Sequence, residues 1–259
     1  MAKQDYAAQH QAFRDECAEN AKGAGADAEL QAKSIDWLVH SCQHKYSYNF
    51  TWLGRPIIQY PQDIVALQEL VWTVKPDLII ETGIAHGGSL ILNASLLALL
   101  DLCEGRTTAP RRVVGVDIEI RPHNRAAIEE HPLFSRISLI EGSSIGEDVI
   151  AHVRRAAAGA ERVLVILDSN HTHAHVLREL ELYSPLVSPG SYCVVFDTVV
   201  EDMPADFFPD RPWGPGDNPK TAVHAFLNTE AGQAFAIDQA LQDKLLITVA
   251  PDGFLKRLA

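Results

Sequence analysis

Cysteine is scarce in this sequence, and basic residues are outnumbered by acidic ones. The four cysteines include no CxxC pair, which argues against a disulfide framework or a zinc knuckle and favours a reducing compartment. Lysine and arginine total 22 against 34 aspartates and glutamates, a formal net charge of −12, and no basic run is longer than a pair. We therefore expect neither nucleic acid nor an anionic membrane to be a partner.

Long apolar runs are also missing. No stretch has the length of a membrane-spanning helix, and the polar segment from Met1 to Asp5 lacks the apolar core of a signal peptide. We expect a soluble, cytoplasmic protein. The 259 residues suffice for one α/β domain with a sizeable core, or for such a domain with a small extension.

The most informative stretch runs from Asp77 to Ser89. Its Leu-Ile-Ile triplet predicts a short buried strand, which is followed by Glu81, a glycine-rich turn and an apolar segment of helical length from Leu90 to Leu102. A strand, a turn and a helix in this order open an α/β nucleotide-binding sheet. The turn has no GxGxxG motif. An acid at the strand end suits a ligand with hydroxyls or a cation, and S-adenosylmethionine offers both.

Strands and helices then alternate along the chain. Further strands are predicted to begin at residues 113, 137, 162 and 192, with helices at 121–130, 145–158 and 172–183 between them. This alternation predicts an α/β fold with a doubly wound, mostly parallel sheet, right-handed crossovers and a ligand site at the carboxyl ends of the strands.

The chain before this sheet is predicted to form an N-terminal extension. Residues 1–26 and a segment from Asp27 read as helices, whereas the aromatic segment 46–56 fits neither a helix nor a clean strand. We expect that segment to be a packed loop or a wall of the ligand site. Because Pro61 suits the first turn of a helix, we divide the chain into an extension, 1–60, and a cofactor-binding domain, 61–259.

The chain after the fifth strand is predicted to include a lid and a terminal strand pair. Segment 198–218 is long and rich in proline, aspartate and phenylalanine, and such loops are usually functional or mobile. Asn218 and Pro219 predict the start of a helix. Segments 235–238 and 245–249 predict two strands, and 251–257 a turn and a short tail.

Acidic residues stand at or beside the ends of the predicted strands: Glu81, Asp117, Glu141, Asp168 and Asp197. Any one of them could be an ordinary helix N-cap. The carboxyl ends of parallel strands, however, meet at one edge of a sheet. We therefore expect these side chains to surround a common cavity.

Asp168, His171 and Asp197 form the predicted catalytic constellation. Two carboxylates on adjacent strand ends can bind a hard cation such as Mg²⁺, and His171 can accept a proton from a hydroxyl. With S-adenosylmethionine on the first two strands, these are the components of O-methyl transfer to a small-molecule hydroxyl. The alternating His171, His173 and His175 would suit zinc on a strand, but a helix here would make them diverge.

Cofactor contacts are predicted along the first four strands. Asp117 suits a ribose hydroxyl, with a helix cap as the alternative, and Ser143 and Ser144 suit the adenine edge or simple turn chemistry. His86 is equally compatible with a contact or with solvent. The predicted cofactor-binding residues are Glu81, Thr82, Gly83, Ala85, Gly87, Ser89, Asp117, Ser143, Ser144 and Asp168.

Several short segments resemble the cephalosporin hydroxylase-type family of S-adenosylmethionine-dependent methyltransferases and, more distantly, the macrolide sugar O-methyltransferases. Their order and spacing are fairly specific for the family but not for a substrate, and they span roughly Ser47 to the C-terminus. The segments are 52–63, 81–83 with 87–89, 115–118, 141–144, 167–171 and 252–257.

The resemblance implies a Rossmann-like methyltransferase fold with a seven-stranded sheet whose final strand is antiparallel. It also implies a Mg²⁺ site and a homo-oligomer assembled partly through N-terminal helices. By position, Asp168 and Asp197 match metal ligands and His171 matches the proposed base.

One position departs from the family pattern. Relatives carry an acidic pair at the end of the fifth strand, where this chain has Phe196 and Asp197, and a phenylalanine cannot bind a metal. Glu201 or Asp202 could replace the missing acid, water could fill the position, or the metal could be weak or absent.

Three functions remain open at this point. An S-adenosylmethionine-dependent O-methyltransferase acting on a sugar or secondary metabolite is favoured. An NAD-binding oxidoreductase is disfavoured by the missing GxGxxG and the long gap from Gly83 to Asp117. A non-catalytic or hydroxylase-associated subunit has Phe196 as its support.

Overall fold

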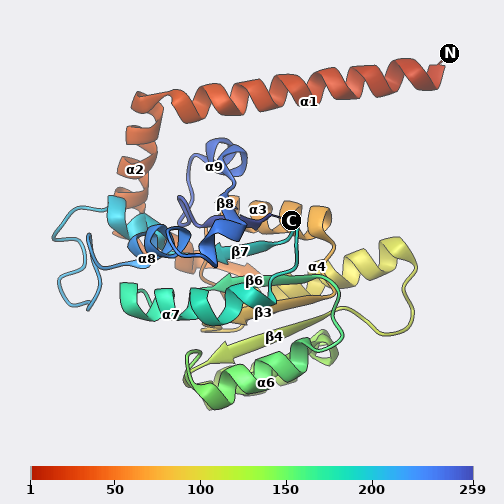
Figure 1. Cartoon of the computed structure of the whole chain (residues 1–259), viewed down its shortest axis with the longest axis vertical. Helices are drawn as coiled ribbons and strands as arrows, with labels where there is room; N and C mark the ends of the chain where they lie inside the picture. The colour runs from red at the N-terminus through yellow and green to blue at the C-terminus, as the bar shows by residue number, and fades with distance from the viewer. Residues whose placement is uncertain (1, 259) are drawn as a thin grey trace.

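Seven strands form one twisted sheet in the computed structural model, which describes residues 2–258 (Figure 1). The sheet order is β5-β4-β3-β6-β7-β9-β8, and the strands from β5 to β7 are parallel. β9 pairs antiparallel with β7 on one side and with β8 on the other. The strands are β3 (Leu78–Thr82), β4 (Arg112–Asp117), β5 (Ile137–Glu141), β6 (Val163–Leu167), β7 (Tyr192–Val195), β8 (Phe235–Ile237) and β9 (Phe254–Arg257). The predicted mostly parallel sheet with an antiparallel final strand is confirmed.

Helices cover both faces of this sheet and give each face its own apolar core. One face carries α3 (Pro61–Val74), α4 (Gly88–Glu104), α5 (Pro122–Glu129) and α9 (Gln239–Leu245), and the other carries α6 (Glu147–Ala157), α7 (His173–Tyr183) and α8 (Pro219–Leu227). Every residue of the central strands β3 and β6 is buried. Burial on both faces explains why these two segments are almost continuously apolar.

The order of strand addition reverses next to β3. The chain first adds β4 and β5 on one side of β3, and then returns to place β6 and β7 on the other side. Such a reversal leaves a crevice at the carboxyl ends of the two central strands, because the flanking connections run to opposite faces. The residues that follow β3 and β6 are therefore brought to one place.

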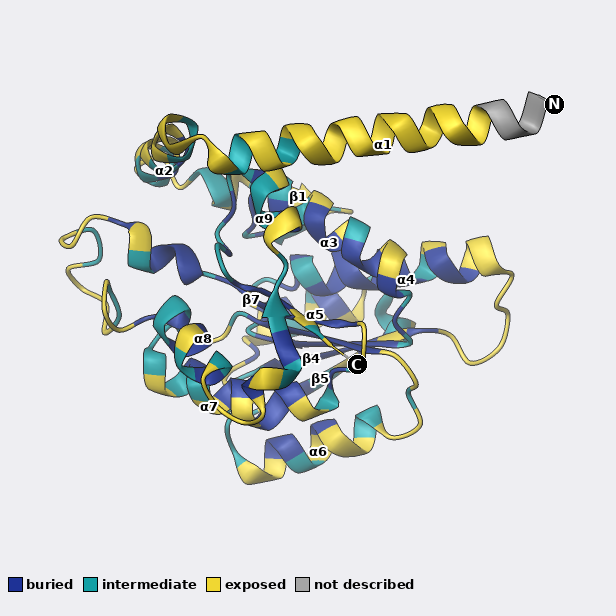
Figure 2. Cartoon of the chain, turned by 45° about the horizontal axis from the view of Figure 1, so that its top comes forward, coloured by how far each residue is buried: buried dark blue, intermediate teal, exposed yellow. Residues whose placement is uncertain are grey.

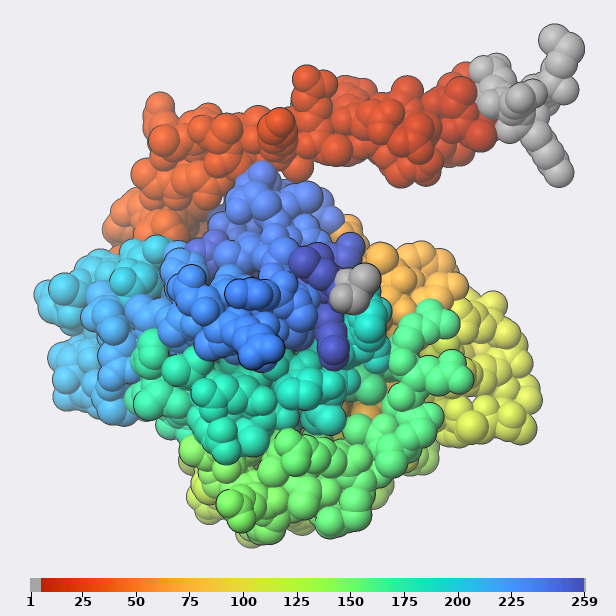
Figure 3. All heavy atoms as spheres, viewed as in Figure 1, coloured from red at the N-terminus to blue at the C-terminus, as the bar shows by residue number. Residues whose placement is uncertain are grey.

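Two N-terminal helices, α1 (Ala2–Ala26) and α2 (Ala28–Cys42), precede the sheet and agree with the prediction. Asp27 caps α2 by accepting a hydrogen bond from the Leu30 N–H. Only the last turns of α1 lie close to the rest of the protein, where Gly25 is packed against Asp243 of α9, and the helix otherwise extends into solvent (Figures 2 and 3). Among the described helices, none is long and apolar enough to cross a membrane.

The aromatic segment is more regular than the loop that the sequence predicted. It forms the 3₁₀ turn η1 (Tyr46–Asn49) and a hairpin of β1 (Phe50–Trp52) and β2 (Arg55–Ile57). The two connecting residues, Leu53 and Gly54, both have positive φ angles, as a type I′ turn in a two-residue hairpin requires. The Trp52 indole donates a hydrogen bond to Ser95 of α4, and this tertiary contact fixes the hairpin.

The predicted strand 245–249 and the predicted C-terminal tail are both wrong. Residues up to 245 belong to α9, and the segment that follows is held by Asp63 of α3, whose carboxylate accepts hydrogen bonds from the Thr248 hydroxyl and the Val249 N–H. A backbone N–H bonded to a side chain is not available to a strand. The last strand is instead β9, where Phe254 and Leu255 are buried between β7 and β8.

Candidate functional site

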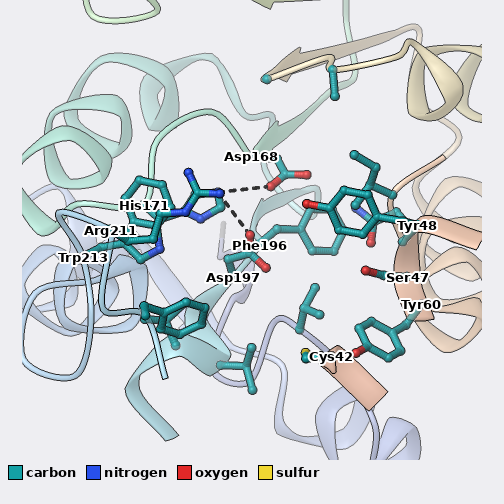
Figure 4. A pocket seen from close by; sticks show the side chains of 18 of the residues that line it. Cys42, Ser47, Tyr48, Tyr60, Asp168, His171, Phe196, Asp197, Arg211 and Trp213 are labelled. Carbon is teal, nitrogen blue, oxygen red and sulfur yellow. Dashed lines mark hydrogen bonds and ion pairs between the residues drawn. The ribbon is translucent and has the colours of Figure 1, made fainter. Parts of the chain in front are cut away.

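A cavity of about 380 Å³ opens at the carboxyl ends of β3, β4, β6 and β7. The sheet contributes polar side chains and the glycine turn, whereas α2, the hairpin and the lid segment contribute mostly apolar and aromatic walls (Figure 4). Its lining residues from the sheet edge are Gly83, Ala85, Asp117, Asp168, Ser169, His171, Phe196 and Asp197.

Gly83 sets the distance between the turn after β3 and the end of β6. Its φ is +81°, and a Cβ atom at this position would lie 1.9 Å from the carbonyl oxygen of Asp168. Only glycine therefore permits this approach of the two backbones. The Asp168 N–H donates to the Thr82 carbonyl at 2.9 Å, which extends the β3–β6 pairing to the first residue of the cavity.

Asp117 holds the glycine turn against the end of β4. Its Oδ2 accepts hydrogen bonds from the N–H groups of Ile84 at 2.9 Å and Ala85 at 3.3 Å, and Oδ1 accepts from Glu119 N–H at 3.2 Å. The helix-cap alternative does not apply, because the N-cap of α5 is Arg121. A carboxylate has about four acceptor positions, so Asp117 retains capacity for a ligand hydroxyl in the cavity that it lines.

Glu81 faces α4 rather than the cavity. It is 1% exposed, and its carboxylate accepts hydrogen bonds from the Ser89 hydroxyl and, at 2.7 Å, from the Asn93 amide. Burial raises the pKa of Glu81 to about 7, although both hydrogen bonds favour its ionised form. This acid therefore links the end of β3 to the first turns of α4.

The predicted cofactor residues fall into two groups by position. Gly83, Ala85, Asp117 and Asp168 line the main cavity, and Ser89 lines a smaller one beside it. Ser144 turns toward α7, where its hydroxyl lies 3.0 Å from His175 Nε2. The residues that line neither cavity are Glu81, Thr82, Gly87, Ser143 and Ser144.

His171, Asp168 and Asp197 do meet, and Figure 4 shows the imidazole directed at both carboxylates. His171 Nε2 lies 3.1 Å from Asp197 Oδ2 and 3.8 Å from Asp168 Oδ1. Asp197 has a φ of 56°, in the left-handed region that non-glycine residues rarely adopt. The backbone turn immediately after β7 thus presents its carboxylate to His171.

These three side chains offer ligand atoms within 4.8 Å of one another, close enough to share one metal ion. Burial raises the pKa of Asp168 well above its usual range, and the negative charges of Asp197 and Glu81 raise it further. A bound cation at this position would relieve that repulsion.

The other two histidines diverge, as predicted for a helix that begins here. His173 Nδ1 lies 2.8 Å from the Thr221 hydroxyl of α8, and His175 approaches Ser144. The three imidazoles therefore do not converge on one ion.

Neither nearby acid replaces the carboxylate that Phe196 lacks. Glu201 accepts hydrogen bonds from the Gly216 N–H and the Asn218 amide, and Asp202 pairs with Lys220 at 2.7 Å. Phe196 itself is 2% exposed and packs into the apolar core. Asp168 and Asp197 are thus the two carboxylates of the cluster.

The walls of the cavity away from the sheet edge are largely aromatic and apolar. The Trp213 ring lies 4.8 Å from the His171 ring and 5.2 Å from the Arg211 guanidinium. Tyr48 and Tyr60 stand on the opposite wall in Figure 4. Further walls come from Leu38, Cys42, Ser47, Val199, Val200, Met203, Phe208 and Val249.

Gln59 is a site residue that the sequence did not single out. It lines both the main cavity and the smaller one, and it is 4% exposed. It lies within the family-like segment 52–63, but an amide in a short connecting segment carries no local signal of function.

Comparison with known proteins gives one family. The sequence model of the family described as Rhamnosyl O-methyltransferase/CmcI matches residues 44–258. The rhamnosyl O-methyltransferase of Mycobacterium leprae (strain TN) is 30% identical over 221 residues, which cover 83% of this chain and 88% of the relative. The Mycobacterium tuberculosis (strain ATCC 25618 / H37Rv) rhamnosyl O-methyltransferase is 30% identical over 222 residues, 83% of each chain.

Solved structures agree with the fold. A structure of CmcI with Mg and SAM has a TM-score of 0.54 and 18% sequence identity, and it covers 82% of this chain and 78% of that chain. An apo-structure of CmcI has a TM-score of 0.53 with 17% identity, covering 82% and 77%. Because the family model matches residues 44–258 and the relatives cover most of the chain, the protein is a member of the rhamnosyl O-methyltransferase/CmcI family of methyltransferases.

Proposed function

We propose that the protein is an S-adenosylmethionine-dependent O-methyltransferase that acts on a sugar hydroxyl of a small molecule. The observation that carries the proposal is the meeting of Asp117, the glycine turn, Asp168 and His171 around one cavity. Family membership supports the reaction, and the rhamnosyl O-methyltransferases among the relatives support a rhamnose-type sugar.

The residues present fit this cofactor. Three carboxylates, from Asp117, Asp168 and Asp197, line the cavity and suit a positively charged sulfonium. Asp117 would bind the ribose hydroxyls, and the turn from Gly83 to Ala85 would lie against the nucleoside. Bound S-adenosylmethionine would supply an activated methyl group.

His171 would accept the proton of the acceptor hydroxyl at Nδ1, the ring nitrogen that does not face Asp197. Asp197, whose Oδ2 lies 3.1 Å from Nε2, would accept a hydrogen bond from Nε2–H, orient the imidazole and stabilise its charged form. Asp168 and Asp197 would hold Mg²⁺, for which oxygen ligands are preferred, and the ion would lower the pKa of the acceptor hydroxyl. Because Phe196 leaves the set one carboxylate short, we propose a weakly held ion.

Methyl transfer to a rhamnoside tests the proposal. Protein is incubated with methyl-labelled S-adenosylmethionine and an aryl rhamnoside, and the product is analysed by mass spectrometry. The expected product carries one added methyl on a sugar oxygen. Label transfer to no rhamnoside, nucleotide sugar or glycosylated metabolite in a panel would contradict it.

We also propose a homo-oligomeric, cytoplasmic protein without nucleic-acid or membrane partners. The support for an oligomer is α1, where Tyr6 and Phe13 are 62% and 64% exposed on a helix that extends away from its own chain. The net charge of −12 supports the absence of polyanionic partners. Light scattering after size-exclusion chromatography, with a Phe13→Lys variant, tests the oligomer.

A further inference from the structure

Gln59 carries a buried oxygen with no protein partner. The residue lies between β2 and α3, is 4% exposed, and its Oε1 makes no hydrogen bond within the described residues. A buried acceptor without a partner destabilises the folded state, and most such atoms in native proteins are satisfied. A ligand that donates a hydrogen bond at this position would remove the penalty.

The position of Gln59 connects two cavities. It lines the main cavity together with Asp168, and it lines the smaller one together with Gly88 and Ser89 at the start of α4. The hairpin presses closely on that helix terminus, because a Cβ atom on Gly88 would lie 2.1 Å from the Pro56 carbonyl oxygen. The smaller cavity is therefore bounded by the connecting segment on one side and by the N-terminus of α4 on the other.

These two sides have complementary chemistry. The first N–H groups of a helix have no intrahelical partner and, with the helix dipole, favour a carboxylate. The unpartnered Gln59 oxygen is an acceptor, and an ammonium group is a donor only. A carboxylate and an ammonium on the same carbon are the amino-acid end of S-adenosylmethionine.

We propose that Gln59 is a positioning residue that accepts a hydrogen bond from the cofactor's α-ammonium group while the start of α4 holds its carboxylate. This inference rests on the proposed function. It places the amino-acid end in the smaller cavity and the nucleoside in the main one, and Asp168, which lines both, lies between them. Gln59 thereby fixes the position of the reacting sulfur relative to Asp168.

The test is calorimetric binding of two probes to the full chain. S-adenosylhomocysteine contains the amino-acid end, and 5′-methylthioadenosine lacks it. Gln59→Leu, with Gln59→Met as a second apolar variant, is expected to weaken S-adenosylhomocysteine binding by about tenfold or more, the usual loss for a hydrogen bond to a charged group. Binding of 5′-methylthioadenosine is expected to change by less than about twofold, which also shows that the variant is folded.

Gln62→Leu is the matched control. Gln62 lies three residues later, also carries a buried Oε1 that has no partner among the described residues, and lines neither cavity. Its substitution is expected to leave both affinities unchanged. If the Gln59 variants bound both probes more weakly to the same extent, or bound neither more weakly, this inference would be overturned and the proposed function would stand. Failure of the wild-type protein to bind either probe would overturn the proposed function as well.

Discussion

The imidazole Nε2 of His171 lies 3.1 Å from Asp197 Oδ2, although the two residues follow different strands. His171 comes four residues after β6, and Asp197 follows β7 in a left-handed backbone conformation. The parallel pairing of β6 with β7 brings the two ends together. In the proposed mechanism this carboxylate accepts a hydrogen bond from Nε2–H, which fixes the ring and leaves Nδ1 as the nitrogen that takes the proton.

Replacement of His171, the proposed base, should lower the rate of methyl transfer without weakening cofactor binding. His171→Ala is expected to lower the methyl-transfer rate by about 10²–10⁴-fold, the usual contribution of a general base. Affinity for S-adenosylhomocysteine should stay within about threefold, because Asp117 and the glycine turn are untouched. Initial rates with labelled cofactor and calorimetric titration check the two results. A variant that retains the wild-type rate would remove His171 from the mechanism.

Addition of the missing carboxylate should strengthen metal binding. Phe196 lines the cavity beside Asp197, so Phe196→Glu places a further hard oxygen ligand next to the existing pair. We expect Mg²⁺ affinity to rise by at least about tenfold, since affinity for hard cations increases with the number of carboxylates. Titration calorimetry with MgCl₂ measures it. Phe196→Gln is the neutral control, and equal affinity in both variants would argue against a metal between Asp168 and Asp197.

Gly83→Ala tests the close approach of β3 and β6. The added Cβ would collide with the Asp168 carbonyl at 1.9 Å and would also force alanine to a φ of +81°. We expect the free energy of unfolding to fall by about 2–5 kcal/mol and cofactor binding to be lost. Gly159→Ala is a matched control, because its φ is +82° with no atom within 4 Å.

Chemical denaturation of both glycine variants separates crowding from backbone strain. The Gly159 variant should lose only the cost of the left-handed conformation, about 1–2 kcal/mol. If the two variants were equally stable, the contact between Gly83 and Asp168 would not be a constraint on the site.

Asp63 makes stability fall as pH rises. Burial raises its pKa to about 7, above the ordinary value of about 3.9, despite hydrogen bonds from Thr248 and Val249. Between these two values the folded protein binds more protons than the unfolded chain, so the free energy of unfolding decreases as pH increases. The contribution is fully present below about pH 4 and is lost through pH 7, and it amounts to roughly 4 kcal/mol.

Asp63→Asn should flatten this part of the pH profile. Urea denaturation at intervals from pH 4 to pH 8 measures the slope for each variant. Asp36→Asn is the control and should leave the slope unchanged, because the Asp36 side chain is 73% exposed in the native protein. An unaltered slope in the Asp63 variant would show that this carboxyl is ionised throughout the range.

The sequence predicted the central sheet because its signals are local. Strands β3 to β7 are short, mostly apolar runs separated by helical periodicity, and β3, β6 and β7 are buried along their whole length. Asn218 and Pro219 also occupy the N-cap and first position of α8, where a capping box forms with Thr221. The meeting of Asp168, His171 and Asp197 followed from strand ends alone.

The features that escaped prediction depend on tertiary contacts. Leu53 has a left-handed backbone conformation, which leucine does not favour. The hairpin is held by the hydrogen bond from the Trp52 indole to the Ser95 hydroxyl. The segment after α9 takes its course from Asp63, which is 185 residues away from Thr248 in the sequence. Both hydrogen bonds join residues far apart in the sequence, so neither can be predicted from a short segment of it.

The orientation of individual side chains was also beyond the sequence. Glu81 stands at a strand end, as predicted, but it is turned toward Ser89 and Asn93 of α4 and does not line the cavity. Gln59 lines it without any motif of its own. The sequence predicts where a residue lies along a strand. The direction of its side chain depends on the helix that packs against that strand. The boundary placed at residue 60 stays a prediction.

The central claim is that the nucleoside binds against the glycine turn and Asp117, with Asp168 and His171 facing it across the same cavity. Calorimetric titration of S-adenosylhomocysteine into wild-type protein and into Asp117→Ala tests it most directly. We predict micromolar binding to the wild-type protein, and at least about tenfold weaker binding to the variant because a charge-assisted hydrogen bond to ribose is removed. Equal affinity of the two proteins, or no heat of binding with either, would contradict the account.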